Sequence, residues 1–213
     1  MNRAKVERDY GGISAADRRA DRRHRLLAAG RRLWGESGVA EVTVRGVCAQ
    51  AGLITRYFYE QFDNREALIF AVADDVRDQL LAAMVTAGVG DPGTLADKLR
   101  SALKAFLEII AADPHVHRIS TGDVSTVPGL TEHRGKILDL ITDEVTRRAP
   151  DVLDGEVPGP NELRRGALFI VGGVNQLIED WLRDPVLAPA ELAGIAADMC
   201  VAYFRGLAHS PTQ

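Results

Sequence analysis

The sequence predicts an all-α protein with a small N-terminal head and a larger helical body, and three observations lead to this fold class. Apolar residues recur at three- and four-residue spacing along most of the chain. No segment of useful length shows the alternation typical of a strand, and clusters of glycine and proline separate the periodic segments. Hydrophobic residues make up 46% of the 213, which is enough to bury a globular core.

The first helix is predicted to begin after Ser14 and to stop at Ser37 and Gly38. Ser14 and Asp17 have the spacing of a capping box, and glycine readily ends a helix. Its expected buried stripe is Leu26, Leu27, Gly30, Leu33 and Trp34. The other faces carry seven arginines, which a solvated helix surface paired with aspartates would explain: Arg18, Arg19, Arg22, Arg23, Arg25, Arg31 and Arg32. Residues 1–13 show no periodicity and are expected to form a flexible basic leader, with a DNA-binding arm as the alternative.

The segment 43–68 has the pattern of a helix-turn-helix followed by a third helix. Thr43 is the expected N-cap of a helix whose apolar face is Val44, Val47, Cys48 and Ala51. Gly52 then allows a tight turn, and Phe58 and Phe62 share one face of the next helix. Asp63 and Glu66 have capping-box spacing, so a further helix should begin at Asn64. Its predicted buried stripe is Leu68, Ile69, Val72, Val76 and Leu80.

This segment resembles the N-terminal signature of the TetR family of bacterial transcriptional regulators. The matching residues are Thr43, Val44, Arg45, Val47, Ala51, Gly52, Leu53, Phe58, Tyr59, Phe62, Arg65, Glu66 and Leu68. There are three departures. Ile54 stands where the family usually caps the recognition helix with serine, Arg56 replaces a frequent glycine, and Glu60 adds a negative charge. Thr55 is the alternative cap for that helix.

The resemblance implies a DNA-binding head, and it assigns contact positions by family analogy. These are Thr43, Arg45, Thr55, Arg56, Tyr57, Tyr59, Gln61 and Arg65. Arg45 and Arg56 are suited to guanine edges, whereas Tyr59, Gln61 and Arg65 are expected to hold phosphates. Packing is the alternative for Tyr57, and an unengaged solvent position is the alternative for Arg65. Near the start of the first helix, the arginines are expected either to be solvated or to contact the DNA backbone.

The charge distribution agrees with this assignment. Residues 1–68 carry 13 Lys+Arg against 9 Asp+Glu, a net charge of +4, whereas residues 69–213 carry 13 against 21, a net charge of −8. Because salt screens distant charges, the local charge of the head matters more for binding a polyanion than the overall −4. The domain prediction is a leader at 1–13, a DNA-binding domain at 14–68 whose last helix continues to about 85, and a ligand-binding and dimerisation domain at 69–213.

Breakers divide the body into amphipathic helices. Residues 88–93 are predicted to form a break, Thr94 to cap the next helix, and residues 122–129 and 150–160 to form loops. The last two helices, 163–182 and 192–207, are apolar around much of their circumference, and Gly172 and Gly173 lie in the middle of the first. A close second helix explains such glycines, and the family resemblance implies a homodimer through these helices. The alternative is that both helices only cover the monomer's own core.

The resemblance also implies a small-molecule pocket within residues 94–182 whose ligand releases DNA. Residues on or among the apolar stripes are the candidate effector contacts: Phe106, His115, His117, His133, Asn175 and Gln176. A metal site at His115 and His117 is not expected, because two histidines two apart on a helix point apart. No cofactor is predicted.

Other functional classes have little support in the sequence. None of the nucleophile-elbow, zinc-protease, phosphate-loop and dinucleotide-binding motifs is present, so no catalytic residue is assigned and an enzyme is not expected. The two cysteines lack metal-ligand spacing, and no apolar run is long enough for a membrane span, so a cytoplasmic protein is expected. The predicted function is a repressor that binds an inverted-repeat operator as a homodimer. Ile54 and Glu60 keep open the alternative of a dimeric ligand-binding protein that has lost DNA binding.

Overall fold

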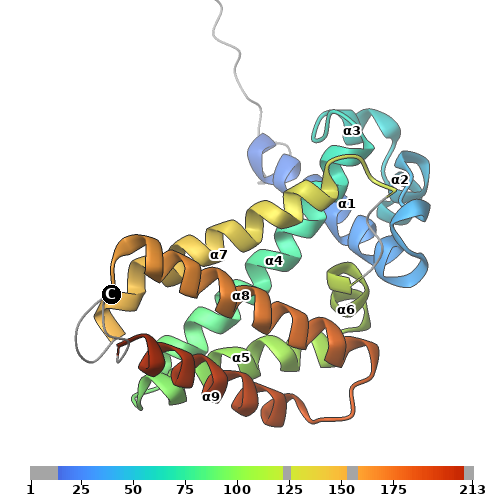
Figure 1. The fold of residues 1–213 in the computed structure, drawn as a ribbon. Helices are drawn as coiled ribbons and strands as arrows, with labels where there is room; N and C mark the ends of the chain where they lie inside the picture. The colour runs from blue at the N-terminus through green and yellow to red at the C-terminus, as the bar shows by residue number, and fades with distance from the viewer. Residues whose placement is uncertain (1–13, 122–125, 153–157, 209–213) are drawn as a thin grey trace, which may run out of the picture.

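The computed structural model describes residues 14–121, 126–152 and 158–208, and all its regular elements in these ranges are helices (Figure 1). The predicted leader at 1–13 lies outside this part of the chain. The elements are α1 (Ala15–Ser37), the short 3₁₀ helix η1 (Val39–Glu41), α2 (Val44–Ala51), α3 (Thr55–Tyr59), α4 (Arg65–Gly90), α5 (Leu95–Ala112), α6 (Pro114–Thr121), α7 (Leu130–Val152), α8 (Pro160–Arg183) and α9 (Pro189–Ala208). The all-α prediction is therefore confirmed.

The predicted signals at the ends of α1 and α2 are confirmed. Ser14 and Asp17 form a reciprocal capping box at α1, and Gly38 ends that helix with a positive φ of 93°. The Thr43 side chain accepts the Gly46 amide at the start of α2, and Gly52 leaves α2 in the left-handed conformation. These local features set the first and last residues of α2.

Two predictions about helix starts in the head are wrong. Asn64, not Asp63, caps α4, because its Oδ1 accepts the Ala67 amide and the helix begins at Arg65. Thr55 does not cap α3, since Ile54 occupies the cap position and makes no side-chain capping bond. Thr55 is the first helical residue, and its side chain hydrogen bonds with the Cys48 thiol on α2. Burial raises the pKa of the Cys48 thiol, and the hydrogen bond with Thr55 offsets only part of this rise.

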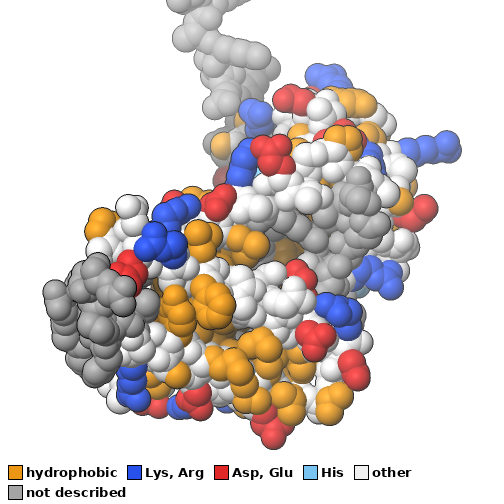
Figure 2. All heavy atoms as spheres, viewed as in Figure 1, with side chains coloured by type: hydrophobic (Ala, Val, Ile, Leu, Met, Phe, Trp, Pro, Cys, Tyr) orange, Lys and Arg blue, Asp and Glu red, His pale blue; other side chains and the backbone are white. Residues whose placement is uncertain are grey.

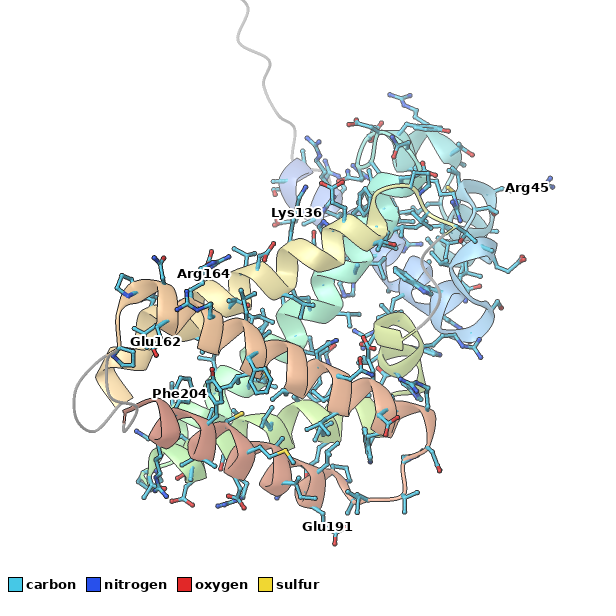
Figure 3. The ribbon with its side chains drawn as sticks, in the orientation of Figure 1. Arg45, Lys136, Glu162, Arg164, Glu191 and Phe204 are labelled. Carbon is cyan, nitrogen blue, oxygen red and sulfur yellow. The ribbon has the colours of Figure 1, made fainter. Side chains whose placement is uncertain are left out.

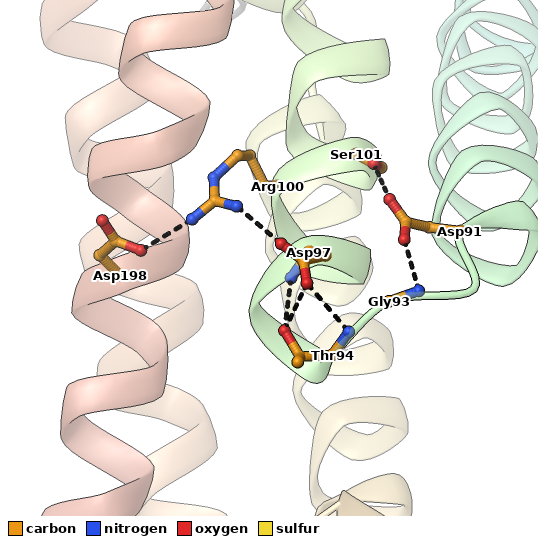
Figure 4. Close-up of polar contacts among 7 residues, drawn as sticks. All are labelled: Asp91, Gly93, Thr94, Asp97, Arg100, Ser101 and Asp198. Atoms are coloured by element: carbon orange, nitrogen blue, oxygen red, sulfur yellow. Dashed lines mark hydrogen bonds and ion pairs between the residues drawn. The ribbon is translucent and has the colours of Figure 1, made fainter.

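In the body, α5 lies between α4 and α9, and α7 packs along α8 (Figure 1). Thr94 and Asp97 form a capping box at the start of α5, as Figure 4 shows. Arg100 on α5 joins Asp97 to Asp198 on α9, at 2.9 and 3.1 Å. The hydrogen bond from the Ser101 hydroxyl, and then that from the Gly93 amide, lower the pKa of the Asp91 carboxyl at the α4–α5 turn.

Two breaks were predicted at the wrong residues. The break at 88–93 is shorter than expected, since α4 continues to Gly90 and a Cβ on Gly88 would touch Ala102 on α5. Close packing against α5 thus accounts for Gly88, a residue that local propensity alone disfavours in a helix. Similarly, α7 runs through Pro150 to Val152, where a loop was predicted. Residues 122–125 and 153–157 of the two predicted loops lie outside the described residues.

One hydrophobic core extends from the head into the body. It includes the whole predicted stripe of α4, together with Trp34 and Phe58 in the head and Leu107 and Ile110 in α5. Because α4 contributes buried side chains to both regions, displacement of body helices can reach the head through close packing. No helix in the described ranges is long and apolar enough to cross a bilayer.

Candidate nucleic-acid interface

Helix α3 has one buried side and one exposed side. Phe58 is fully buried and Phe62, just beyond the helix, is 4% exposed, with their ring centroids 5.7 Å apart. Arg56 and Tyr59 lie on the exposed side, where the Arg56 side chain is 81% exposed and Tyr59 is 58% exposed. The buried phenylalanines therefore fix the helix, and the exposed side remains open to a partner.

Two arginines extend from the helix-turn-helix. Arg45 on α2 projects away from the head into solvent in Figure 3 and has no side-chain partner among the described residues. Arg56 on α3 forms a 3.2 Å ion pair with Glu60, and Arg22 approaches the same carboxylate at 3.9 Å. The negative charge of Glu60 is thus balanced within the head.

The arginines of α1 have a role that neither sequence interpretation considered. The guanidinium of Arg25 donates to the Ala51 carbonyl at the end of α2, at 2.5 Å. Arg19 and Arg23 donate to the carbonyls of Glu60 and Gln61, just after α3, at 3.2 and 3.4 Å. Cationic donors stabilise the unpaired carbonyls and the negative dipole end of a helix. These three arginines therefore hold the reading helices in place.

An apolar groove runs between α8 and α9 on the outside of the body. Its volume is about 500 Å³, and its lining includes Phe169, Gly173, Gln176, Leu177, Met199 and Tyr203. Hydrophobic side chains gather over these two helices in Figure 2. Phe169 is 67% exposed although its ring stacks on Tyr203, with centroids 5.1 Å apart. An apolar surface of this kind is typical of a contact with another protein or a ligand.

Comparison with known proteins identifies the family that the helix-turn-helix region resembles. Residues 26–72 match the family model described as bacterial regulatory proteins, tetR family. The match covers the end of α1, the whole motif and the start of α4. The helix-turn-helix head of this chain therefore matches the TetR family.

Similarity to known proteins also extends over the body. The HTH-type transcriptional regulator TtgR from Pseudomonas putida is 26% identical over 175 residues, covering 76% of this chain and 81% of TtgR. SmeT, the repressor of the Stenotrophomonas maltophilia multidrug efflux pump SmeDEF, shares the fold with a TM-score of 0.65 and 20% identity, covering 85% and 91% of the two chains. FadR from Bacillus subtilis, solved with stearoyl-CoA, has a TM-score of 0.62 and 15% identity, covering 84% and 98%. The curated relatives are regulators rather than enzymes.

Two residues that the TetR resemblance assigned to phosphates have side-chain nitrogens directed into the protein. Arg65 donates through Nε to the Val42 carbonyl and through Nη2 to the Val39 carbonyl at 2.7 Å, so it holds the turn before α2. The side-chain nitrogen of Gln61 is buried and has no hydrogen-bond partner in the described structure. Phosphate contact by either residue would require its side chain to rotate outward, because neither now faces solvent freely.

The remaining predicted DNA contacts are divided between packing and exposure. The Tyr57 ring lies under the Arg22 guanidinium, 4.7 Å from its centroid, which favours the packing alternative. The hydroxyl groups of Thr43 and Thr55 are used in the cap of α2 and the contact with Cys48. Arg45, Arg56 and Tyr59 are left as the side chains most available to DNA.

Arg65→Ala should destabilise the head by about 2 to 3 kcal/mol, since two main-chain carbonyls lose a charged donor. Urea unfolding monitored by circular dichroism measures this change. Arg45→Ala is the matched control, and it should leave the unfolding midpoint unchanged because Arg45 has no such partners. An unaltered midpoint for Arg65→Ala, combined with weaker DNA binding, would restore the phosphate role.

The six predicted effector residues do not converge on one pocket. His115 lies against α1, whereas the His133 Nε2 contacts Asp74 on α4 at 2.7 Å. Gln176 lines the α8–α9 groove, and Asn175 donates to Glu179 on the same helix at 3.0 Å. The two other candidates are Phe106, which packs against the core, and His117, on α6 with His115. No cluster of three metal-ligating side chains is found in the described ranges.

A polar junction that sequence reasoning missed joins the TetR-type head to the body. Arg31 on α1 pairs with Asp113 before α6 at 2.7 Å and donates to Gln79 on α4 at 2.9 Å. Burial raises the pKa of the Asp113 carboxyl, but hydrogen bonds from the His115 amide and then from Arg31 outweigh it, so the pKa is lowered. Arg118 on α6 also donates to the Glu36 carbonyl of α1. These contacts lie far apart in sequence, which is why no local pattern revealed them.

Proposed function

We propose that this chain is a repressor that binds a palindromic DNA operator as a homodimer and leaves it when a small molecule binds the body. The observation that carries this proposal is the exposed side of α3, where Arg56 and Tyr59 face solvent while Phe58 and Phe62 anchor the helix. A helix that packs on the core through one side and exposes the other side to solvent is suited to insertion into the major groove.

The proposed contacts follow from side-chain chemistry. Arg45 and Arg56 present guanidinium groups that suit the O6 and N7 acceptors of guanine. Tyr59 is suited to hold a phosphate, and Thr43 lies at the start of α2, where the family contacts the DNA backbone. The internal pairing of Glu60 with Arg22 and Arg56 reduces its repulsion of phosphate, which weakens the main reason for supposing that DNA binding has been lost.

Arg56→Ala should relax base preference at one position of each half-site, at a cost of about 1 to 3 kcal/mol for the cognate duplex. Fluorescence anisotropy with cognate and random duplexes at fixed salt measures both affinities. Arg147→Ala, which removes another exposed arginine from α7, is the control and should change neither affinity. Equal losses on the two duplexes after Arg56→Ala would contradict base reading by this residue.

A homodimer through α8 and α9 supplies the second reading head. A Cβ at Gly172 or Gly173 would meet nothing within 4 Å in this protomer, so the protomer itself offers no packing reason for these glycines. The neighbouring exposed side chains of Phe169, Ile195 and Met199 supply apolar surface for a partner. A two-fold interface of this kind would fix the spacing of the heads and favour an inverted-repeat operator.

The effector response is proposed to reach the head through the junction of α1, α4 and α6. A ligand that prefers the arrangement unable to bind DNA lowers operator affinity by the ratio of its affinities for the two states. Arg31 contacts both α4 and the start of α6, so a displacement of α6 changes contacts of α1 directly. The stearoyl-CoA in the FadR structure supports a ligand-binding role for the body, without identifying the effector here.

The proposed function is tested by selecting bound duplexes from a random pool and then transcribing a promoter that carries the selected sequence. A repressor should enrich an inverted repeat and reduce transcript in proportion to its occupancy. Enrichment followed by increased transcript would make the protein an activator. Failure to retain any duplex at moderate salt would favour the alternative of a helical ligand-binding protein.

A further inference from the structure

Ile54 is a large apolar side chain held at the surface beside the reading helix. It occupies the cap position of α3 with extended backbone angles, φ −82° and ψ 153°, and the residue is 62% exposed. The preceding residue, Leu53, packs against the core. Because successive side chains of an extended backbone point in opposite directions, burial of Leu53 directs Ile54 outward.

The fold itself does not benefit from isoleucine at this position. A serine, threonine, asparagine or aspartate would accept an amide of α3, and its absence typically costs about 1 kcal/mol. The exposed side chain also contributes little to the core. The advantage of Ile54 is therefore expected in a complex, where its apolar surface becomes buried.

The surroundings of Ile54 indicate what would bury it. Arg56 lies two residues further on and is almost fully exposed, and Arg45 extends from the other helix of the motif. Cationic and apolar side chains exposed on the same motif suit a polyanion with a local apolar feature. In the major groove of DNA that feature is the C5-methyl group of thymine, which apolar side chains contact.

We propose that Ile54 reads the C5-methyl group of one thymine in each operator half-site. This inference rests on the proposed function, because it requires the head to bind duplex DNA. It adds a specificity-determining residue at the position where the family usually has a serine. The contact is apolar, so it selects thymine over cytosine and over uracil without a hydrogen bond.

The test uses deoxyuridine, which differs from thymidine only by the missing methyl group. An operator is first selected with the wild-type dimer, and each symmetric thymine pair is then replaced in turn. At one pair, wild-type affinity should fall about fourfold per half-site, or about fifteenfold for the dimer, as expected for one buried methyl group. Ile54→Ser should lose almost nothing from the same replacement.

Ile54→Ser is suited to this comparison because serine restores a capping side chain and should preserve α3. Ile54→Val keeps a branched apolar group and should retain most of the sensitivity to the methyl group. Equal losses for wild type and Ile54→Ser at every thymine pair would overturn the inference while leaving the proposed function intact. If the wild-type protein retained no duplex, the proposed function would fail, and the thymine contact with it.

Discussion

Replacing Phe169 by glutamate should dissociate the proposed homodimer and abolish tight operator binding. Phe169 is exposed in the protomer and lines the α8–α9 groove, so a two-fold partner would bury it twice. Loss of a central aromatic contact typically costs about 2 kcal/mol or more, and two copies should weaken dimerisation on the order of a thousandfold. Sedimentation equilibrium at micromolar concentration measures this shift, and gel retardation measures its effect on DNA.

Val89→Glu provides the matched control for this experiment. Val89 is 72% exposed near the end of α4 and does not line the groove, so the same change there should leave the mass unchanged. A wild-type protein that sediments as a monomer would contradict the homodimer outright. A Phe169→Glu variant that stays dimeric would place the interface on another face.

The substitution Gly35→Ala should destabilise the protein, although alanine is normally the better helix former. A Cβ on Gly35 would lie 2.4 Å from the Cβ of His115, so α1 and α6 would have to separate. Overpacking of this kind costs about 1 to 3 kcal/mol, which exceeds the gain of up to about 1 kcal/mol from helix propensity. Thermal unfolding measures the change in stability. Because α6 carries Arg118, its displacement should also disturb the contact with Glu36.

Gly135→Ala on α7 tests whether packing is the cause. A Cβ on Gly135 would meet nothing within 4 Å, so this variant should gain stability from helix propensity alone. The two variants make the same chemical change within helices and are expected to shift the melting temperature in opposite directions. If Gly35→Ala raised the melting temperature, close packing of α6 on α1 would be refuted.

The sequence predicted the features of the head that depend on neighbouring residues. Thr43 and Gly52 define the ends of α2 through one hydroxyl and one left-handed backbone conformation. The stripe from Leu68 to Leu80 is buried as its helical spacing predicts. Asp63 and Asn64 are adjacent, and both residue types are good N-caps. The capping-box spacing pointed to Asp63, whereas Asn64 caps α4 in the structure. Which of two adjacent residues caps a helix depends on backbone angles that the sequence pattern does not reveal.

The candidate DNA surface was only partly predictable for a related reason. The motif located the reading helix, but arginines at similar positions have different roles in the folded protein. Arg56 is exposed on α3, Arg25 stabilises the end of α2, and Arg65 holds the turn before α2. A guanidinium on a long side chain reaches whichever acceptors the fold brings near, and these are often distant in sequence.

The order of residues by itself determined the all-α class, most helix limits and the location of the reading motif, because capping, turns and apolar periodicity act over three or four residues. Only the tertiary structure decided which arginines remain available, where the histidines lie and how α6 contacts α1 at Gly35 and Arg31. These features depend on the distances between helices that are far apart along the chain. Such distances are set by side-chain packing across the whole core, and no short segment contains that information.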